Sequence, residues 1–205
     1  MDSNQGYKNR ALADLEGNWT DAAIVTLVLL LVLEVGGGSI SFIMPPLIEK
    51  GTHFVWFLLC IPLGWGYTVM FLDFIRYSEK LTLSKMFSGY KEWSRTITTY
   101  LLMYIYIFLW TLLLIIPGII KAYSYALTPY ILKDNPELSN NAAIEESMQM
   151  MDGHKWKLFW LHLSFIGWLI LSLLTLGIGL IFLQPYMRAA ESHFYEDLKR
   201  EKQIY

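Results

Sequence analysis

Leu15-Glu16-Gly17-Asn18-Trp19 is the first copy of a pattern that occurs three times in this chain. In each copy a short helical stretch ends in glycine, a tryptophan follows within four residues, and a long apolar run begins. The other two copies are Met86–Trp93 and Met150–Trp156, and successive glycines are 72 and 64 residues apart. A unit of that length can hold two membrane helices and a connector. The pattern therefore predicts three related units, each built on a pair of helices.

The composition is that of a membrane protein. Of the 205 residues, 55% are hydrophobic and 17% are charged, whereas soluble domains carry about 25% charged residues. The net charge of -2 gives no reason to expect nucleic acid as a partner. Cys60 is the single cysteine, which excludes an intramolecular disulfide and a cysteine-based zinc cluster. Residues 1–16 lack the apolar core of a cleavable signal peptide, so we expect the first apolar helix to serve as an uncleaved anchor.

Six apolar runs are candidates for membrane spans. The first begins near Thr20 and meets Gly36-Gly37-Gly38, which leaves open whether residues 36–48 span or re-enter the membrane. Pro117-Gly118 and Gly177-Ile178-Gly179 predict tight turns between later runs. The later runs cover residues 53–76, 96–116, 119–132 and 156–176, and the sixth follows the last turn, reaches residue 190 and continues as a charged helix to residue 202.

These features predict an all-α fold, a polytopic membrane helix bundle formed by one integral membrane domain over residues 1–205. Its six transmembrane helices form three helical hairpins, with amphipathic connecting helices on the cytosolic face. The predicted pseudo-repeats cover residues 5–78, 79–134 and 139–202, each boundary being approximate.

Two of the connecting segments show the amphipathic pattern clearly. Residues 5–16 place their apolar side chains on one face, so we expect this helix to lie on the membrane surface. Ser139 is the expected N-cap of a second such helix over residues 140–151. The apolar face of the first helix consists of Tyr7, Ala11, Leu12 and Leu15.

Positive charge decides the orientation. Of the 16 lysines and arginines, all but Lys50 and Lys121 fall on one side of the six-span arrangement. The positive-inside rule makes that side cytosolic. Both termini and all three glycine–tryptophan patterns are then expected at the cytosolic face. Tryptophan is favoured at the level of the headgroups, so we interpret these tryptophans as anchors rather than as ligand contacts.

Several stretches of this sequence match a known family. They are Arg10-Ala11 with Leu15–Trp19, Ser147–Lys155, Leu163–Trp168, Thr175–Gly179 and Pro185-Tyr186. With these stretches, the chain resembles a family of bacterial six-span membrane proteins of unknown function. That family is related to the membrane domain attached to some glycerophosphodiester phosphodiesterases. The resemblance implies a multi-pass protein of the bacterial cytoplasmic membrane. It implies no substrate, because no activity is established for that family. The related phosphodiesterases keep their catalysis in a separate soluble domain.

Few ionisable side chains fall within the predicted spans, where a charge at the centre costs roughly 3 kcal/mol or more. Glu34 and Lys121 lie near the outer ends of their spans, and they either pair across the bundle or each reach the outer interface. Asp73 and Arg76 are three residues apart on one helix face, which favours a local ion pair.

Three further polar side chains are candidates for lipid or transport contacts. Gln184 and Arg188 share one face of the sixth span. Arg188 either extends to the interface or binds a lipid phosphate on the cytosolic side. His162 is alone in an apolar run, which favours a hydrogen-bonded packing histidine over a proton relay.

The sequence lacks the common enzyme motifs. It has no glycine-rich phosphate loop, no His-Glu-x-x-His and no Gly-x-Ser-x-Gly. We therefore expect no catalytic residue, metal ligand or cofactor. The first hypothesis is a non-enzymatic accessory, assembly or protective factor. Its partners would be membrane lipids, with another membrane protein or a second copy of the chain as further partners.

The alternative hypothesis is a small transporter or permease. Internal repeats and helices broken by glycine or proline are typical of transporters. Its site would lie among Glu34, Lys121 and His162.

Overall fold

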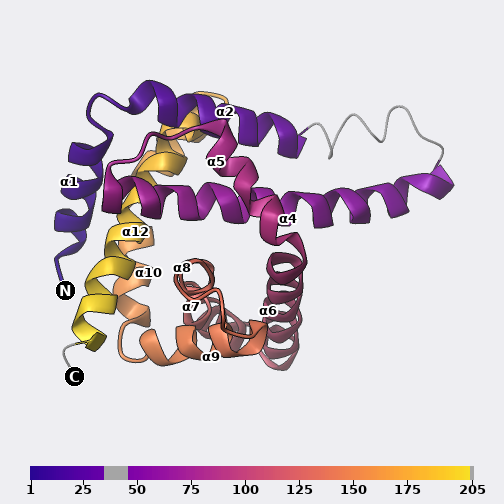
Figure 1. The fold of residues 1–205 in the computed structure, drawn as a ribbon. Coiled ribbons are helices and arrows are strands. Elements are labelled where there is room, and N and C mark those ends of the chain that lie inside the picture. Colours follow the sequence, from indigo (N-terminus) through magenta and orange to yellow (C-terminus); the bar gives the residue numbers. More distant parts are fainter. Residues whose placement is uncertain (35–45, 204–205) are drawn as a thin grey trace.

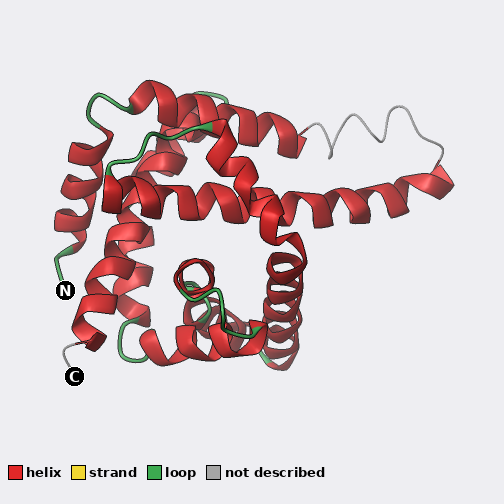
Figure 2. Cartoon of the chain, in the orientation of Figure 1, coloured by secondary structure: helices red, strands yellow, loops and turns green. Residues whose placement is uncertain are grey.

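The computed structural model describes the backbone of residues 1–34 and 46–203, and the side chains of residues 1–34 and 52–202. Every regular element in this part of the chain is a helix (Figure 2), which confirms the predicted all-α class. Whether residues 36–48 span or re-enter the membrane depends on residues 36–45, which lie outside the described residues. The first half contains α1 (Asn4–Leu15), α2 (Trp19–Glu34), α4 (Pro46–Tyr77), α5 (Leu83–Phe87), the 3₁₀ helix η2 (Ser88–Glu92) and α6 (Trp93–Leu113). The second half contains α7 (Ile115–Ser124), α8 (Thr128–Asp134), α9 (Asn140–Met150), α10 (Lys155–Leu163), α11 (Ile166–Leu174) and α12 (Leu180–Gln203).

Each glycine–tryptophan pattern lies at a junction between helices. Trp19 is the first residue of α2, Trp93 is the first residue of α6, and Trp156 is the second residue of α10. Gly17 and Gly153 have φ angles of 79° and 80°. This left-handed conformation commonly ends a helix and favours glycine. In the first and third copies the glycine therefore ends the preceding helix with the same backbone conformation.

The middle copy uses its glycine differently. A Cβ atom on Gly89 would lie 2.0 Å from the carbonyl oxygen of Pro62, and one on Gly66 would lie 2.0 Å from the carbonyl oxygen of Met86. The two backbones are thus in direct contact, which requires glycine on both sides. α4 also continues through Pro62 and Gly66 without a break.

The two later turns differ from each other. Gly177 has a φ angle of 86° and lies between α11 and α12, as predicted. The other turn falls at Leu114, between α6 and α7, and not at the predicted Pro117-Gly118. Pro117 lies in the first turn of α7. Proline is tolerated there because the backbone N–H groups of the first turn have no hydrogen-bond partner within the helix. Gly118 instead allows close packing, since a Cβ there would lie 2.1 Å from the hydroxyl oxygen of Thr111.

Helix α1 packs against protein with the face that was expected to lie on the membrane surface. Its Tyr7, Ala11 and Leu15 side chains are fully buried. The Tyr7 ring meets the Phe194 ring of α12 edge-on, with 5.7 Å between their centres. Figure 1 shows α1 beside the C-terminal part of α12. That part of α12 carries its own apolar stripe, so the two amphipathic helices cover each other.

Three helical stretches of the described residues are long and apolar enough to cross a membrane. They are Thr52–Tyr77, Leu83–Leu113 and Lys155–Leu174. α1 and α2 form a pair bent by 99°, which makes four candidates if the pair is counted as one span. The predicted fourth span consists of two separate helices, α7 and α8. Side chains 112–116, at the α6–α7 turn, are each 68–73% exposed although all are Leu or Ile.

Candidate functional site

Three helices are joined by an ion-pair cluster at one end of the bundle. Arg76 of α4 donates to Asp134 of α8 with an Nη2–Oδ2 distance of 2.7 Å, and to Glu196 of α12 with an Nε–Oε1 distance of 2.6 Å. Lys199 and the hydroxyl of Tyr195, both on α12, also donate to Asp134. Burial by itself raises the pKa of Asp134, but the hydrogen bonds from its three donors outweigh it and lower the pKa to about 2. This charged carboxylate therefore links α4, α8 and α12.

The neighbouring charges of α4 do not pair with each other. The amine of Lys133 lies 3.0 Å from the carboxylate of Asp73, while Arg76 pairs with Asp134. The predicted local pair between Asp73 and Arg76 is therefore not what the structure shows. The physical reason is that α8 packs along α4 and presents a lysine and an aspartate in succession.

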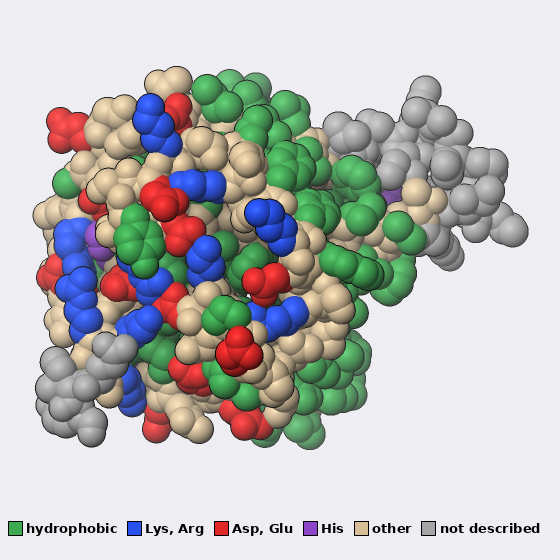
Figure 3. Space-filling view, viewed as in Figure 1, with side chains coloured by type: hydrophobic (Ala, Val, Ile, Leu, Met, Phe, Trp, Pro, Cys, Tyr) green, Lys and Arg blue, Asp and Glu red, His purple; other side chains and the backbone are tan. Residues whose placement is uncertain are grey.

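Basic side chains gather over α12 at the same end of the molecule (Figure 3). They border a polar groove of about 550 Å³. Its cations are largely neutralised, because Arg10 pairs with Asp197 at 2.8 Å and both Arg76 and Lys199 pair with Asp134. A groove whose cations already have carboxylate partners is poorly suited to bind an anion. Its lining includes Arg10, Arg76, His193, Glu196, Lys199 and Arg200.

A second ionic cluster lies between α10 and α12. His162 Nε2 is 2.8 Å from Glu191 Oε1, and Arg188 Nη1 is 2.7 Å from Glu191 Oε2. Tyr123 of α7 has its hydroxyl 3.4 Å from His162 Nδ1. The predicted hydrogen bonding of His162 is confirmed, and its main partner is a carboxylate. Arg188 likewise has a carboxylate partner on its own helix.

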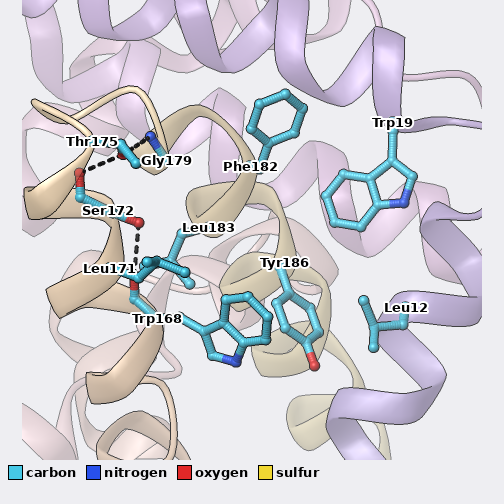
Figure 4. A pocket seen from close by; sticks show the side chains of 10 residues that line it. All are labelled: Leu12, Trp19, Trp168, Leu171, Ser172, Thr175, Gly179, Phe182, Leu183 and Tyr186. Carbon is cyan, nitrogen blue, oxygen red and sulfur yellow. Dashed lines mark hydrogen bonds between the residues drawn. The ribbon is translucent and has the colours of Figure 1, made fainter.

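An apolar groove of about 350 Å³ runs between α1, α2, α11 and α12. Figure 4 shows the rings of Trp19, Trp168, Phe182 and Tyr186 around it. The hydroxyls of Ser172 and Thr175 in this groove already have backbone partners. Ser172 donates to the carbonyl of Trp168 at 2.8 Å, and Thr175 donates to the carbonyl of Ser172 at 2.9 Å. The groove therefore offers a ligand mainly carbon surface.

A family model named "Protein of unknown function (DUF975)" matches residues 1–124 and 111–202. The chain belongs to the DUF975 family. No curated protein and no solved structure matches it. Membership in DUF975 agrees with the resemblance to an uncharacterised family. The relationship to the phosphodiesterase membrane domain stays a prediction.

The structure places the remaining candidate residues apart. Glu34 is exposed at the end of α2, and the Lys121 amine lies 4.9 Å from the centre of the Trp110 ring and 3.6 Å from the sulfur of Met148. His162 lies with Glu191, and Gln184 lines a cavity beside that histidine. Glu34, Lys121 and His162 thus have separate environments.

Sequence reasoning missed Glu191, which is the centre of the second cluster. One signal could have found it. Glu191 follows Arg188 by three residues, a spacing that puts two side chains on one helix face.

Proposed function

We propose that this DUF975 protein is a non-enzymatic integral membrane protein of the bacterial cytoplasmic membrane that binds membrane lipid. In this proposal it acts as an accessory, assembly or protective factor for the membrane or for a protein within it. It crosses the bilayer six times as three hairpins, with both termini in the cytosol. The apolar groove between α1, α2, α11 and α12 takes an acyl chain.

The apolar groove is the observation that carries this proposal. Its volume of about 350 Å³ falls in the range of small-ligand pockets, roughly 300–1,000 Å³. Trp168 is 52% exposed and Phe182 is 49% exposed, so their rings need cover from an apolar neighbour. Because the hydroxyls of Ser172 and Thr175 already bond to the backbone, the groove favours hydrocarbon over a polar substrate.

The positions of the chain ends support the proposed orientation. The N-terminal amine of Met1 lies 3.7 Å from Glu201, and Figure 1 shows both ends on the same side of the molecule. The ion pairs of Arg76, Asp134 and Lys199 join the predicted cytosolic ends of three different segments. If all three segments end at one membrane face, their ends must lie close together, and these ion pairs agree with that arrangement.

The transporter alternative draws less support from the geometry. A transport site needs its polar side chains around one cavity near the middle of the membrane. Glu34 is exposed at a helix end, Lys121 contacts Trp110 and Met148, and His162 pairs with Glu191. The proposed trio therefore does not form a shared site, and lipid binding is the better-supported function.

The test compares two leucines of α11. Leu171 lines the groove, whereas Leu173 is 63% exposed and is not part of the lining. The full-length protein is purified in mild detergent, and phospholipid that co-purifies with it is identified and counted by mass spectrometry. We expect wild type and Leu173→Trp to retain phospholipid, and Leu171→Trp to lose most of it because the indole fills the groove.

Two outcomes would refute lipid binding at this groove. One is equal lipid retention by Leu171→Trp and Leu173→Trp. The other is a wild-type protein that retains no phospholipid after gentle extraction.

A further inference from the structure

One end of the apolar groove between α1, α2, α11 and α12 carries polar groups that a hydrocarbon chain alone would leave unused. Figure 4 shows the Tyr186 hydroxyl, the Trp168 ring and Leu12 at this end of the groove. Thr175, which follows α11, and Gly179, which precedes α12, lie at the opposite end. The groove therefore runs from the α11–α12 turn towards α1, and its α1 end is the polar one.

The Tyr186 side chain is buried, yet its hydroxyl has no hydrogen-bond partner among the described residues. Tyr186 is 6% exposed, and its ring packs edge-on against the Phe165 ring with 4.9 Å between the ring centres. The hydroxyl points into the space between Trp168 and Leu12 (Figure 4). Buried tyrosine hydroxyls usually find a partner. A ligand that places an oxygen acceptor at this position would complete the hydrogen bond.

A lysine lies next to the same end of the groove. Lys8 precedes the lining residue Leu12 by four positions, so both lie on one face of α1. The Lys8 amine donates to the carbonyl oxygen of Ser164 at 3.1 Å and lies 4.9 Å from the centre of the Phe165 ring. Because the Phe165 ring also contacts Tyr186, the cation lies beside the Tyr186 end of the groove. An ammonium group has three N–H donors, so two remain for a ligand.

The charge around this end is positive. Lys157 of α10 has its amine 5.9 Å from the centre of the ring of Tyr7, the residue before Lys8. Within the described part of the chain, neither lysine pairs with a carboxylate. The acidic side chains closest to Lys8 in the sequence already form ion pairs, which are Asp2–Arg10 and Asp14–His193. A headgroup that enters here therefore meets cations with no carboxylate to offset them, which favours a net negative headgroup.

We propose that the groove binds an anionic glycerophospholipid. One acyl chain lies along the groove, an ester oxygen accepts from the Tyr186 hydroxyl, and the phosphate accepts from the Lys8 amine. The inference rests on the proposed lipid-binding function and names the class of lipid. The order of these contacts matches the lipid itself, in which the ester lies between the chain and the phosphate. In the proposed orientation α1 is at the cytosolic face, so the lipid belongs to the inner leaflet.

The experiment is a competition between two lipids for the full-length protein. The protein is purified in dodecyl maltoside, freed of lipid, and mixed with equal amounts of phosphatidylglycerol and phosphatidylethanolamine that have the same acyl chains. The protein is then isolated again, and the bound molecules of each lipid are counted by mass spectrometry. We expect phosphatidylglycerol to exceed phosphatidylethanolamine by about fivefold, the gain that one lysine near an anionic headgroup provides. The ammonium group of phosphatidylethanolamine would instead face the two lysines.

Two variants separate the assigned roles. Lys8→Gln removes the charge and keeps a polar side chain, so the ratio of the two lipids should fall about fivefold, towards equal binding. Tyr186→Phe keeps the ring and removes the hydroxyl, which contacts a group that both lipids share. It should lower the retention of both lipids by about two- to tenfold and leave their ratio unchanged.

The matched control is Lys91→Gln, because Lys91 is an exposed lysine of η2 that is not part of the groove lining. It should retain both lipids like wild type. Gel filtration and thermal unfolding check that each variant is folded. A folded Lys8→Gln variant with the wild-type ratio overturns the assignment of the phosphate to Lys8.

Failure of this inference can be told apart from failure of the proposed function. If wild type retains both lipids equally and Leu171→Trp loses both, the groove still binds lipid, but the preference for an anionic headgroup is wrong. If wild type retains neither lipid, the lipid-binding function itself is wrong, and the inference falls with it.

Discussion

Replacing Gly66 by alanine tests whether the contact between α4 and the α5–η2 segment is as close as the structure indicates. The new Cβ would lie 2.0 Å from the carbonyl oxygen of Met86, whereas carbon and oxygen in such contacts are at least about 3.3 Å apart. The two backbones must therefore separate by about 1.3 Å. Overpacking usually costs about 1–3 kcal/mol, and a backbone carbonyl cannot rotate away as a side chain can. We expect Gly66→Ala to lower the free energy of unfolding by about 3 kcal/mol.

Gly64 provides the matched control, because it lies two residues away on the same helix. A Cβ there would meet no atom within 4 Å. Alanine favours a helix over glycine by up to about 1 kcal/mol, so Gly64→Ala should be neutral or stabilising. The assay is unfolding of the protein in mild detergent by added dodecyl sulfate, followed by circular dichroism. If Gly66→Ala unfolds at the same denaturant fraction as Gly64→Ala, the backbone contact inferred for Gly66 is wrong.

Three further perturbations follow from other contacts. The pKa of Asp134 is lowered from 3.8 to about 2, so its contribution to stability is present above about pH 4 and is lost as the pH falls through 2. That contribution to the free energy of unfolding is about 2 kcal/mol. Asp134→Asn should therefore remove this pH dependence from the free energy of unfolding measured as a function of pH. Ser147 is fully buried and donates to the carbonyl of Ser124 at 2.8 Å while accepting from the amide of Leu127 at 3.2 Å; Ser147→Ala should cost about 1–3 kcal/mol in thermal unfolding, and an unchanged midpoint would contradict this role. Gly153 has a φ of 80°, so Gly153→Ala should cost about 1–2 kcal/mol, measured in the same way.

The sequence predicts the end of a helix correctly where a local signal, such as a capping side chain or a glycine, determines that end. Ser139 accepts from the amide of Ala142 and caps α9 as expected, and Gly17 and Gly153 adopt the left-handed conformation that ends a helix. Gly89 carries the same sequence pattern, yet its role depends on Pro62, a residue of another helix. Periodicity cannot reveal that role, because the contact joins segments that are distant in the chain.

The same distinction explains the errors at the charged residues. Spacing correctly places Asp73 and Arg76 on one face of α4, but their partners belong to α8. An exposed intrahelical pair contributes only about 0.3–0.5 kcal/mol, so a cross-helix carboxylate that is largely buried readily replaces it. Asp134 is such a carboxylate, with 8% of its side chain exposed. Similarly, the sequence predicts which face of α1 is apolar, but it does not predict that this face packs against α12 instead of lying on the membrane surface.

The α6–α7 and α11–α12 pairs share a close packing contact at their turns. A Cβ on Gly118 would lie 2.1 Å from the Thr111 hydroxyl oxygen, and a Cβ on Gly179 would lie 2.6 Å from the Ser172 hydroxyl oxygen. In both pairs of helices the glycine follows the hydroxyl residue by seven positions. Both hydroxyls also donate to the carbonyl four residues earlier, at 2.8 Å. The two turns have different backbones, so this contact does not follow from turn geometry alone. The predicted repeat stays a prediction for the whole chain, and the glycine–hydroxyl contact is the feature by which its second and third units can be compared.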